Sequence, residues 1–271
     1  MTVRVLVTGA DGRIGARLPQ TPGVSWIRAS HAELDVADRA AWREALTAKR
    51  PEVVVQLAGM TSAGTDPGAM RRVNVDAVRL LAEEAARAGA GIVLASSAAV
   101  YGDRHERPVD ESSALDGVGP YAESKIAAEE LLSTAVVRGD LRAAAALRIF
   151  NVFGPGMRDS LVNRLQSAVA GPPVPLRGPR GFVRDYVHVD DVGEALARAA
   201  RGLEPGWLPV NVGRGIPVDN QDLAGSLGLT EGVAFVWADG PPSFSCAVVD
   251  RAAAVFGVRP ARGPTAVGGT L

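Results

Sequence analysis

The sequence predicts an α/β protein with a doubly wound parallel sheet, followed by a smaller C-terminal cap. Three observations predict this fold class. Apolar runs alternate with helical patterns from residue 3 to residue 149, as expected of βαβ units. A glycine-rich turn follows the first apolar run, and beyond residue 150 Gly-Pro pairs break the chain into short pieces. The 271 residues suffice for one large domain with a small addition.

Strands are predicted where most consecutive residues are apolar, and helices where apolar residues recur every three or four positions. Both patterns alternate through the first half of the chain. The predicted strands cover Val3 to Thr8, Val24 to Arg28, Val53 to Leu57, Ile92 to Ser96 and Leu141 to Ile149. The predicted helices cover Ile14 to Leu18, Asp38 to Thr47, Pro67 to Ala88 and Tyr121 to Val137.

Composition excludes several classes of partner. The 29 Lys and Arg residues against 30 Asp and Glu give a formal net charge of −1, so we expect neither nucleic acid nor a membrane as a partner. No apolar run approaches the roughly 20 residues that span a bilayer, and the N-terminus lacks a signal-peptide pattern. The single cysteine, Cys246, favours a reducing compartment, and we expect a cytoplasmic protein with no metal site.

A glycine-rich turn, GADGRIG from Gly9 to Gly15, separates the first predicted strand from the first helix. Glycines here permit a tight turn and let backbone N–H groups approach a pyrophosphate. The spacing is GxxGxxG, whereas GxGxxG is the commoner dinucleotide fingerprint, and an ordinary glycine turn is the alternative. Its position between a strand and a helix favours a Rossmann-type, dinucleotide-binding fold.

The domain organisation is predicted from the point near residue 150 where the regular alternation ends and Gly-Pro breaks begin. We expect residues 1–150 to form the dinucleotide-binding domain, with elements that return to it around residues 183–212. Residues 151–182 and 213–262 then form a small substrate-binding cap. The remaining residues, 263–271, are expected to be a loose tail.

Tyr121 and Lys125 form the second motif. Four residues apart on a helix, they share a face. An ammonium near a phenol favours the phenolate, so we expect Lys125 to lower the pKa of Tyr121 for acid/base chemistry. With 3 tyrosines and only two lysines (Lys49 and Lys125) in 271 residues, a chance Tyr-x-x-x-Lys pair has a frequency of about 0.02. The alternative is a surface helix pair.

The third motif is SSAAVYG, from Ser96 to Gly102, at the end of a predicted strand. Open α/β sheets bind ligands at the carboxyl ends of their strands. A serine hydroxyl there can hold a substrate oxygen against the tyrosine. The alternative is a helix cap or a turn, which is the commoner role of such serines.

Together these motifs resemble the extended short-chain dehydrogenase/reductases, the NAD-dependent epimerase/dehydratase family that acts on nucleotide sugars. The resemblance covers nearly the whole chain, in order and spacing. It rests on TGADGRIG, Leu57-Ala58-Gly59, Asn74-Val75, SSAAVYG, Tyr121-x-x-x-Lys125, the run Arg148 to Pro155 and the run Arg184 to Asp191.

The resemblance implies a role for each matching residue. Tyr121 is the expected general acid/base, Lys125 binds the nicotinamide ribose, and Ser97 orients the reacting carbonyl or alcohol. The expected cofactor-binding residues are Gly9, Asp11, Gly12, Arg13, Ile14, Gly15, Arg28, Ser30, Asp35, Val36, Leu57, Ala58, Gly59, Asn74 and Lys125. The expected substrate-binding residues are Ser96, Asn151 and Arg184, the last two at the diphosphate.

The region around Arg184 and the C-terminal segment need separate comment. For Arg184, the alternative is a structural ion pair with Asp185 or Asp190. His188 is expected to pack beneath the sheet. Relatives often provide a second phosphate-binding arginine near the C-terminus, but the corresponding region here, Asp239 to Phe244, contains none.

Departures from the family narrow the reaction. Ala98 and Ala99 stand where dehydratases and decarboxylases carry acidic residues, so water loss after C5 deprotonation is not expected. The cysteine and histidine of double epimerases are replaced by alanine and by Gly156. The reaction class that remains after these exclusions is the transfer of a hydride and a proton at one carbinol carbon.

Cofactor choice is predicted from the end of the second strand. The segment Trp26 to His31 contains no carboxylate for a ribose 2′-hydroxyl. Arg28, with Ser30 and Arg13, favours NADP(H), and NAD(H) is the alternative. A reductase exchanges its cofactor in every cycle, so the leading prediction is a 4-ketoreductase of a nucleotide-linked deoxysugar.

Other functions stay open at this point. The alternative is a nucleotide-sugar 4-epimerase that holds NAD tightly. A dehydrogenase of a free sugar or small alcohol and a non-catalytic dinucleotide sensor are less favoured. The resemblance also implies a homodimer formed through the helices Pro67 to Ala88 and Tyr121 to Val137.

Overall fold

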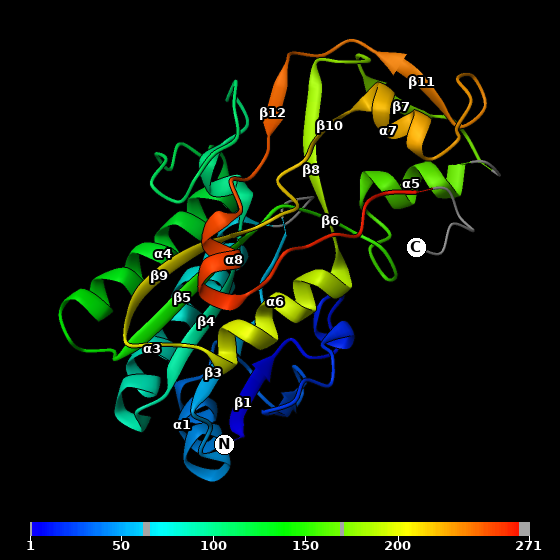
Figure 1. The fold of residues 1–271 in the computed structure, drawn as a ribbon. Helices are drawn as coiled ribbons and strands as arrows, with labels where there is room; N and C mark the ends of the chain where they lie inside the picture. The colour runs from blue at the N-terminus through cyan, green and yellow to red at the C-terminus, as the bar shows by residue number, and fades with distance from the viewer. Residues whose placement is uncertain (1, 62–65, 169–170, 266–271) are drawn as a thin grey trace.

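A computed structural model describes residues 2–61, 66–168 and 171–265 of the chain. Its centre is a six-stranded sheet in the order β2-β1-β3-β4-β5-β9, in which every neighbouring pair is parallel (Figure 1). The strands are β1 (Val3–Thr8), β2 (Val24–Ala29), β3 (Val53–Gln56), β4 (Gly91–Ser97), β5 (Ala143–Ile149) and β9 (Gly206–Val212). The strand order reverses between β1 and β3, which is where open α/β sheets form their ligand crevice.

Helices cover both faces of this sheet, as a doubly wound fold requires. One face packs on α1 (Arg39–Lys49), α3 (Ala77–Ala88) and α4 (Pro120–Val137). The other packs on α6 (Val189–Arg201) and α8 (Asp250–Phe256). Successive strand residues supply opposite faces, so Leu6 belongs to the first core and its neighbours Val5 and Val7 to the second. The Rossmann-type fold predicted from the alternating pattern is confirmed.

The first crossover is shorter than such folds usually have. The predicted helix from Ile14 to Leu18 is a single 3-10 turn, η1 (Gly15–Arg17). Pro19 and Pro22 follow it, and proline in a helix interior removes a hydrogen bond and clashes with the preceding turn. The chain therefore reaches β2 within a few residues.

The predicted helix from Pro67 to Ala88 is continuous but irregular. It consists of α2 (Pro67–Arg71), a π-helical turn η2 (Arg72–Asp76) and α3. Such π turns occur often at functional sites. Here the turn carries the buried side chain of Asn74.

A second, smaller region lies beyond the carboxyl ends of the main strands (Figure 1). In its main sheet β8 is the central strand, which pairs with β6, β10 and β12, while β7 and β11 pair separately. Its own apolar core lies between these strands and two short helices. The elements are β6 (Asn151–Phe153), α5 (Leu161–Ser167), β7 (Val174–Arg177), β8 (Phe182–His188), β10 (Pro217–Asp219), α7 (Asn220–Ser226), β11 (Phe235–Ala238) and β12 (Ser243–Ser245).

The segments that belong to the main sheet and to the smaller region differ in part from the predicted ranges. Of the segment 183–212, only α6 and β9 return to the main sheet, because β8 is paired within the smaller region. Within 213–262, α8 packs on the main core through Ala252 and Phe256. The predicted tail at 263–271 lies largely outside the described residues.

Two kinds of feature are absent from residues 2–61, 66–168 and 171–265. No helix there combines the length and hydropathy needed to cross a membrane. No group of three or more His, Cys, Asp or Glu side chains is arranged to hold a metal ion.

Candidate active site

The carboxyl ends of the central strands enclose a cavity of about 440 Å³. Arg13 and Ile14 line it from the glycine turn, and Leu57 and Gly59 line it from the segment after β3. The opposite wall is formed by Ser97, Tyr121 and Lys125. The topology thus brings the three motifs of the sequence to one crevice.

Ser97 and Tyr121 lie close enough for the Ser97 hydroxyl to lower the pKa of Tyr121. Ser97 ends β4, and its hydroxyl accepts the Ala99 N–H at 3.2 Å, which begins the 3-10 turn η3 (Ala98–Tyr101). Tyr121 lies in the first turn of α4. Lys125 follows one turn later, with Nζ 5.9 Å from the centre of the Tyr121 ring.

A second cavity, of about 870 Å³, lies on the other side of this pair. Ser97 and Tyr121 line both cavities. Of these two cavities, Asn151 and Arg184 line the second and not the first. Molecules bound in the two cavities would therefore meet at the Tyr121 hydroxyl, which is the arrangement that transfer of hydride and proton at one carbon requires.

The electrostatics of the pair differ from the sequence-based expectation. Burial raises the pKa of Tyr121, and the Ser97 hydrogen bond and the charge of Arg13 oppose that shift. Lys125 is not among the groups that lower it. Its Nζ donates to the Ala95 carbonyl at 2.9 Å, and burial lowers the pKa of Lys125 to about 8, opposed by the charge of Glu129.

The glycine turn forms a cradle that side chains would fill. A Cβ on Gly15 would lie 2.4 Å from the Gly9 carbonyl oxygen, so the helix start packs directly on the turn. Gly9 has φ of +64°, and a Cβ there would lie 2.8 Å from the Ala58 nitrogen. Thr8 closes the base of the turn, since its hydroxyl donates to Gln56 at 2.9 Å and accepts the Ala58 N–H at 3.2 Å. This cradle fits the pyrophosphate of a dinucleotide.

Comparison with known proteins decides the family. Residues 5–213 match the model of the NAD dependent epimerase/dehydratase family. The chain belongs to this family. It is 30% identical to the UDP-glucose 4-epimerase of Mycolicibacterium smegmatis. This alignment, over 263 residues, covers 83% of each of the two chains.

Solved structures agree with this epimerase/dehydratase assignment. MoeE5 in complex with UDP-glucuronic acid and NAD has a TM-score of 0.79 at 29% identity, covering 96% of this chain and 94% of that one. The Thermus thermophilus UDP-glucose 4-epimerase in complex with NAD has a TM-score of 0.80 at 27% identity, with the same coverage. The chain is therefore an extended short-chain dehydrogenase/reductase, an enzyme that uses a pyridine nucleotide.

Asn74, one of the residues expected at the cofactor, shapes the loop after β3. The buried Asn74 accepts the Met60 N–H at 2.8 Å and donates to the Met60 carbonyl at 3.0 Å. Its amide also donates to Ser124 at 3.0 Å, and Ser124 donates to the Tyr121 carbonyl at 2.7 Å. Asn74 thereby links the loop containing Leu57 to the first turn of α4.

Asp35 and Val36 have local structural partners. The Asp35 carboxylate accepts the Ala37 N–H at 2.9 Å, a turn interaction. The Val36 side chain is buried in the core beneath α1, and its carbonyl accepts the indole N–H of Trp42 at 2.9 Å. Asp11 is exposed on the glycine turn, and Arg13 pairs with Asp159 at 2.9 Å.

Arg28 has a structural role at the end of η1. Its guanidinium donates to the carbonyls of Gly15 at 2.7 Å and Leu18 at 3.2 Å. It therefore satisfies the orphan carbonyls of the shortened first turn. Ser30, two residues later, donates from both its N–H and its hydroxyl to the Glu33 carboxylate, each at 2.8 Å. The sequence reasoning did not single out Glu33. Its carboxylate lies beside Ser30 at the end of β2, where the segment Trp26 to His31 has none of its own.

A buried polar network lies behind Ser97, Tyr121 and Lys125, and the sequence reasoning missed most of it. Ser96, expected at the substrate, donates its hydroxyl to Glu129. Arg148 donates to Glu129 at 2.7 Å and to the Tyr101 hydroxyl at 2.8 Å. Tyr101 in turn donates to Asn211 at 2.8 Å. The available signal was the spacing of Glu129, one turn after Lys125 on the same face of α4.

Arg184 has neither of the carboxylate partners considered from the sequence. It donates to the Ser243 hydroxyl at 2.6 Å and pairs with Asp103 at 3.3 Å. Its guanidinium carbon lies 3.7 Å from the centre of the Phe182 ring. Asn151 donates to the Asp185 carbonyl at 3.2 Å.

Proposed function

We propose that this enzyme is a nucleotide-sugar 4-epimerase that works on UDP-hexoses with a retained NAD. The relatives that match it are named UDP-glucose 4-epimerases, and MoeE5 was solved with UDP-sugars and NAD. The observation that carries the proposal is the Ser97–Tyr121 pair at the boundary of two cavities. These relatives favour the epimerase over the 4-ketoreductase that led the sequence-based prediction.

The cofactor we propose is NAD(H) instead of NADP(H). MoeE5 and the Thermus thermophilus UDP-glucose 4-epimerase were both solved with NAD. Arg28, the reason for expecting NADP(H), is engaged with backbone carbonyls. Glu33 holds a carboxylate at the end of β2, where an acidic group accepts hydrogen bonds from the ribose 2′-hydroxyl and repels a 2′-phosphate.

The chain's own residues would divide the chemistry as follows. The glycine turn, Leu57, Gly59 and Lys125 would hold the dinucleotide, which would supply hydride acceptance and donation at the sugar C4. Inversion at C4 would require the hydride to leave one face of that carbon and to return to the opposite face. Tyr121 would take the proton from the C4 hydroxyl and give it back to the same oxygen. Ser97 would hold that oxygen beside the phenol. Release of hydride and proton and their return leave no net oxidation, so no second substrate is consumed.

The direct test uses purified protein without added nucleotide. We expect bound NAD to be released on denaturation and the native protein to interconvert UDP-glucose and UDP-galactose, or the corresponding UDP-uronic acids. Protein reconstituted with NAD that leaves both pairs unchanged but consumes NADPH with a 4-keto nucleotide sugar would establish the ketoreductase and overturn the epimerase.

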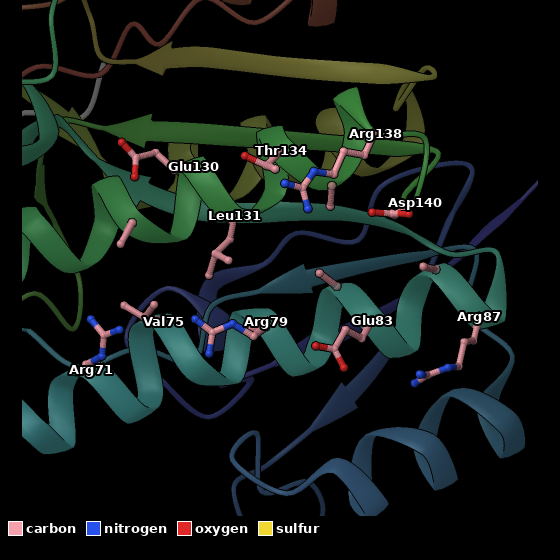
Figure 2. Close-up of a pocket in the computed structure, with 14 residues that line it drawn as sticks. Arg71, Val75, Arg79, Glu83, Arg87, Glu130, Leu131, Thr134, Arg138 and Asp140 are labelled. Carbon is pink, nitrogen blue, oxygen red and sulfur yellow. The ribbon is translucent and has the colours of Figure 1, made fainter.

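We also infer a homodimer formed through α3 and α4. A groove of about 660 Å³ runs between these helices, and Figure 2 shows Leu131 of α4 pointing into it opposite α3. Arginines and carboxylates both line the groove, among them Arg79 and Glu83 of α3, so a two-fold contact can pair opposite charges (Figure 2). Light scattering is expected to give twice the 28.1 kDa chain mass, and a monomer alone would refute this assignment.

The single cysteine supports a reducing, cytoplasmic location. Cys246 is buried, and burial raises the pKa of its thiol to about 12. A buried thiol of this kind is inert.

A further inference from the structure

A third cavity, of about 380 Å³, lies next to the two that meet at Tyr121. Arginines from three different elements line it: Arg164 of α5, Arg177 of β7 and Arg184 of β8. Arg184 also lines the cavity that contains Ser97 and Tyr121. A ligand that passes Arg184 can therefore occupy both cavities at once.

The positive charge of this third cavity is only partly neutralised by the protein. Asp159, the carboxylate that lines it, pairs with Arg13 of the glycine turn. Asp103, the partner of Arg184, is half exposed. Among the described residues, neither Arg164 nor Arg177 has an ion-pair partner. Uncompensated guanidinium groups around a cavity favour a polyanionic ligand.

Arg177 and Arg184 share one aromatic support. Their guanidinium carbons lie 5.8 Å and 3.7 Å from the centre of the Phe182 ring. The two charges are close enough for Arg177 to lower the pKa of Arg184, adding to the larger effect of burial. Two guanidinium groups held on one ring form a pair that a diphosphate can bridge, because each fork binds phosphate oxygens in a bidentate manner.

The C-terminal segment makes room for Arg177. A Cβ on Gly240 would lie 3.0 Å from Cδ and 3.1 Å from Cγ of Arg177, so the arginine stem packs directly on the glycine. Gly240 lies in the segment Asp239 to Phe244, which contains no arginine of its own. Arg177 of β7 therefore lies directly beside the segment in which relatives often provide the second phosphate-binding arginine.

We propose that Arg177 is the second diphosphate-binding residue of this enzyme and that it clamps a nucleoside diphosphate together with Arg184. This inference rests on the proposed function and adds the residue that completes its substrate site. With the diphosphate between the two arginines, the sugar lies in the cavity of Tyr121 and the nucleoside in the third cavity.

The test compares Arg177→Gln with Arg180→Gln in the full-length protein by isothermal titration calorimetry. Gln keeps part of the Arg177 stem on Gly240 and Phe182 but removes the charge. Arg180 is the matched control: it lies three residues along, pairs with Asp219 at 3.3 Å and is absent from the lining of the third cavity. The probes are UDP, dTDP and GDP for the diphosphate, uridine for the base alone, and NAD for the other cavity.

We expect Arg177→Gln to weaken binding of the preferred nucleoside diphosphate about tenfold or more, the usual loss for a charge-assisted hydrogen bond. Uridine and NAD affinities should stay unchanged, and Arg180→Gln should bind all probes like the wild type. Circular dichroism melts confirm that both variants are folded.

The outcomes separate this inference from the proposed function. If the wild type binds a nucleoside diphosphate and Arg177→Gln binds it equally well, the second clamp is refuted and the epimerase proposal stands. If the wild type binds NAD but none of the three nucleoside diphosphates, both proposals fail. If Arg177→Gln and Arg180→Gln lose the same affinity for the nucleoside diphosphate, the loss comes from general surface charge. That result would also refute the clamp.

Discussion

Replacing Glu129 by Gln tests the buried network behind the active site. The Glu129 and Arg148 side chains are 2% and 5% exposed, and their closest N–O distance is 2.7 Å. Gln keeps the shape but removes the negative charge, which leaves the guanidinium buried without a counter-ion. Breaking such a buried pair costs about 3–5 kcal/mol of unfolding free energy. For a chain of this size, that corresponds to a fall in Tm of about 10 °C.

The assay is urea unfolding at pH 7, followed by circular dichroism and by tryptophan fluorescence. Glu194→Gln is the matched control, because its i,i+4 pair with Arg198 is 38% exposed on both sides and should contribute less than about 1 kcal/mol. The double variant Glu129→Leu, Arg148→Met should recover most of the lost stability, since apolar replacement of both partners removes the unpaired charge.

Two results would refute the reasoning. One is a Glu129→Gln variant within about 1 kcal/mol of the wild type, which would mean that water reaches the guanidinium. The other is a double variant as unstable as the single one, which would show that the loss comes from packing and not from charge.

Three further predictions concern single residues. Burial holds the pKa of Lys125 at about 8 against 10.5, so the unfolded chain binds more protons in this window and the wild type gains stability as pH rises from 8 to 10.5. Below pH 8, Lys125→Met should be more stable than the wild type, because it removes a buried charge. Unfolding at several pH values should show this difference shrinking by about 3 kcal/mol between pH 8 and 10.5, and a constant difference would contradict the pKa shift. Gly15→Ala should lower Tm and abolish NAD binding, since its Cβ would lie 2.4 Å from a backbone oxygen, whereas Gly225→Ala, with nothing within 4 Å, should leave both intact. Glu33→Gln should weaken NAD binding several-fold with no loss of NADP affinity; equal losses of both would remove Glu33 from cofactor selection.

Much of the architecture could be predicted from the sequence because local patterns determine it. The strand Val3 to Thr8 and the turn after it were recognisable from a single apolar run and three glycines. The helix containing Tyr121 was predicted over Tyr121 to Val137, within one residue of its observed bounds, Pro120–Val137. Their convergence at one crevice follows from parallel topology, because all carboxyl ends of parallel strands meet at one edge.

The partners of charged side chains could not be predicted in the same way. Arg28 stands at the strand end where a phosphate ligand is expected, but the shortened helix before it leaves carbonyls that its guanidinium satisfies. Arg184 pairs with Asp103, 81 residues away, and Ser96 with Glu129, 33 residues away. Such contacts depend on how distant segments pack, which no local spacing encodes. The pKa of Tyr121 was misjudged for the same reason, since burial raises it, while the groups that oppose this shift are Ser97 and Arg13 and not Lys125.

The most direct test of the central claim is the turnover of Tyr121→Phe with UDP-glucose, measured beside its affinities for NAD and UDP. Tyr121 is the group at which the two cavities meet, so removal of its hydroxyl should lower kcat/KM by about 10²–10⁴-fold, the usual contribution of a positioned acid/base. Both affinities should stay within about twofold of the wild type. Turnover retained at the wild-type rate, or lost only because NAD no longer binds, would contradict the assignment of Tyr121 as the proton-transfer group.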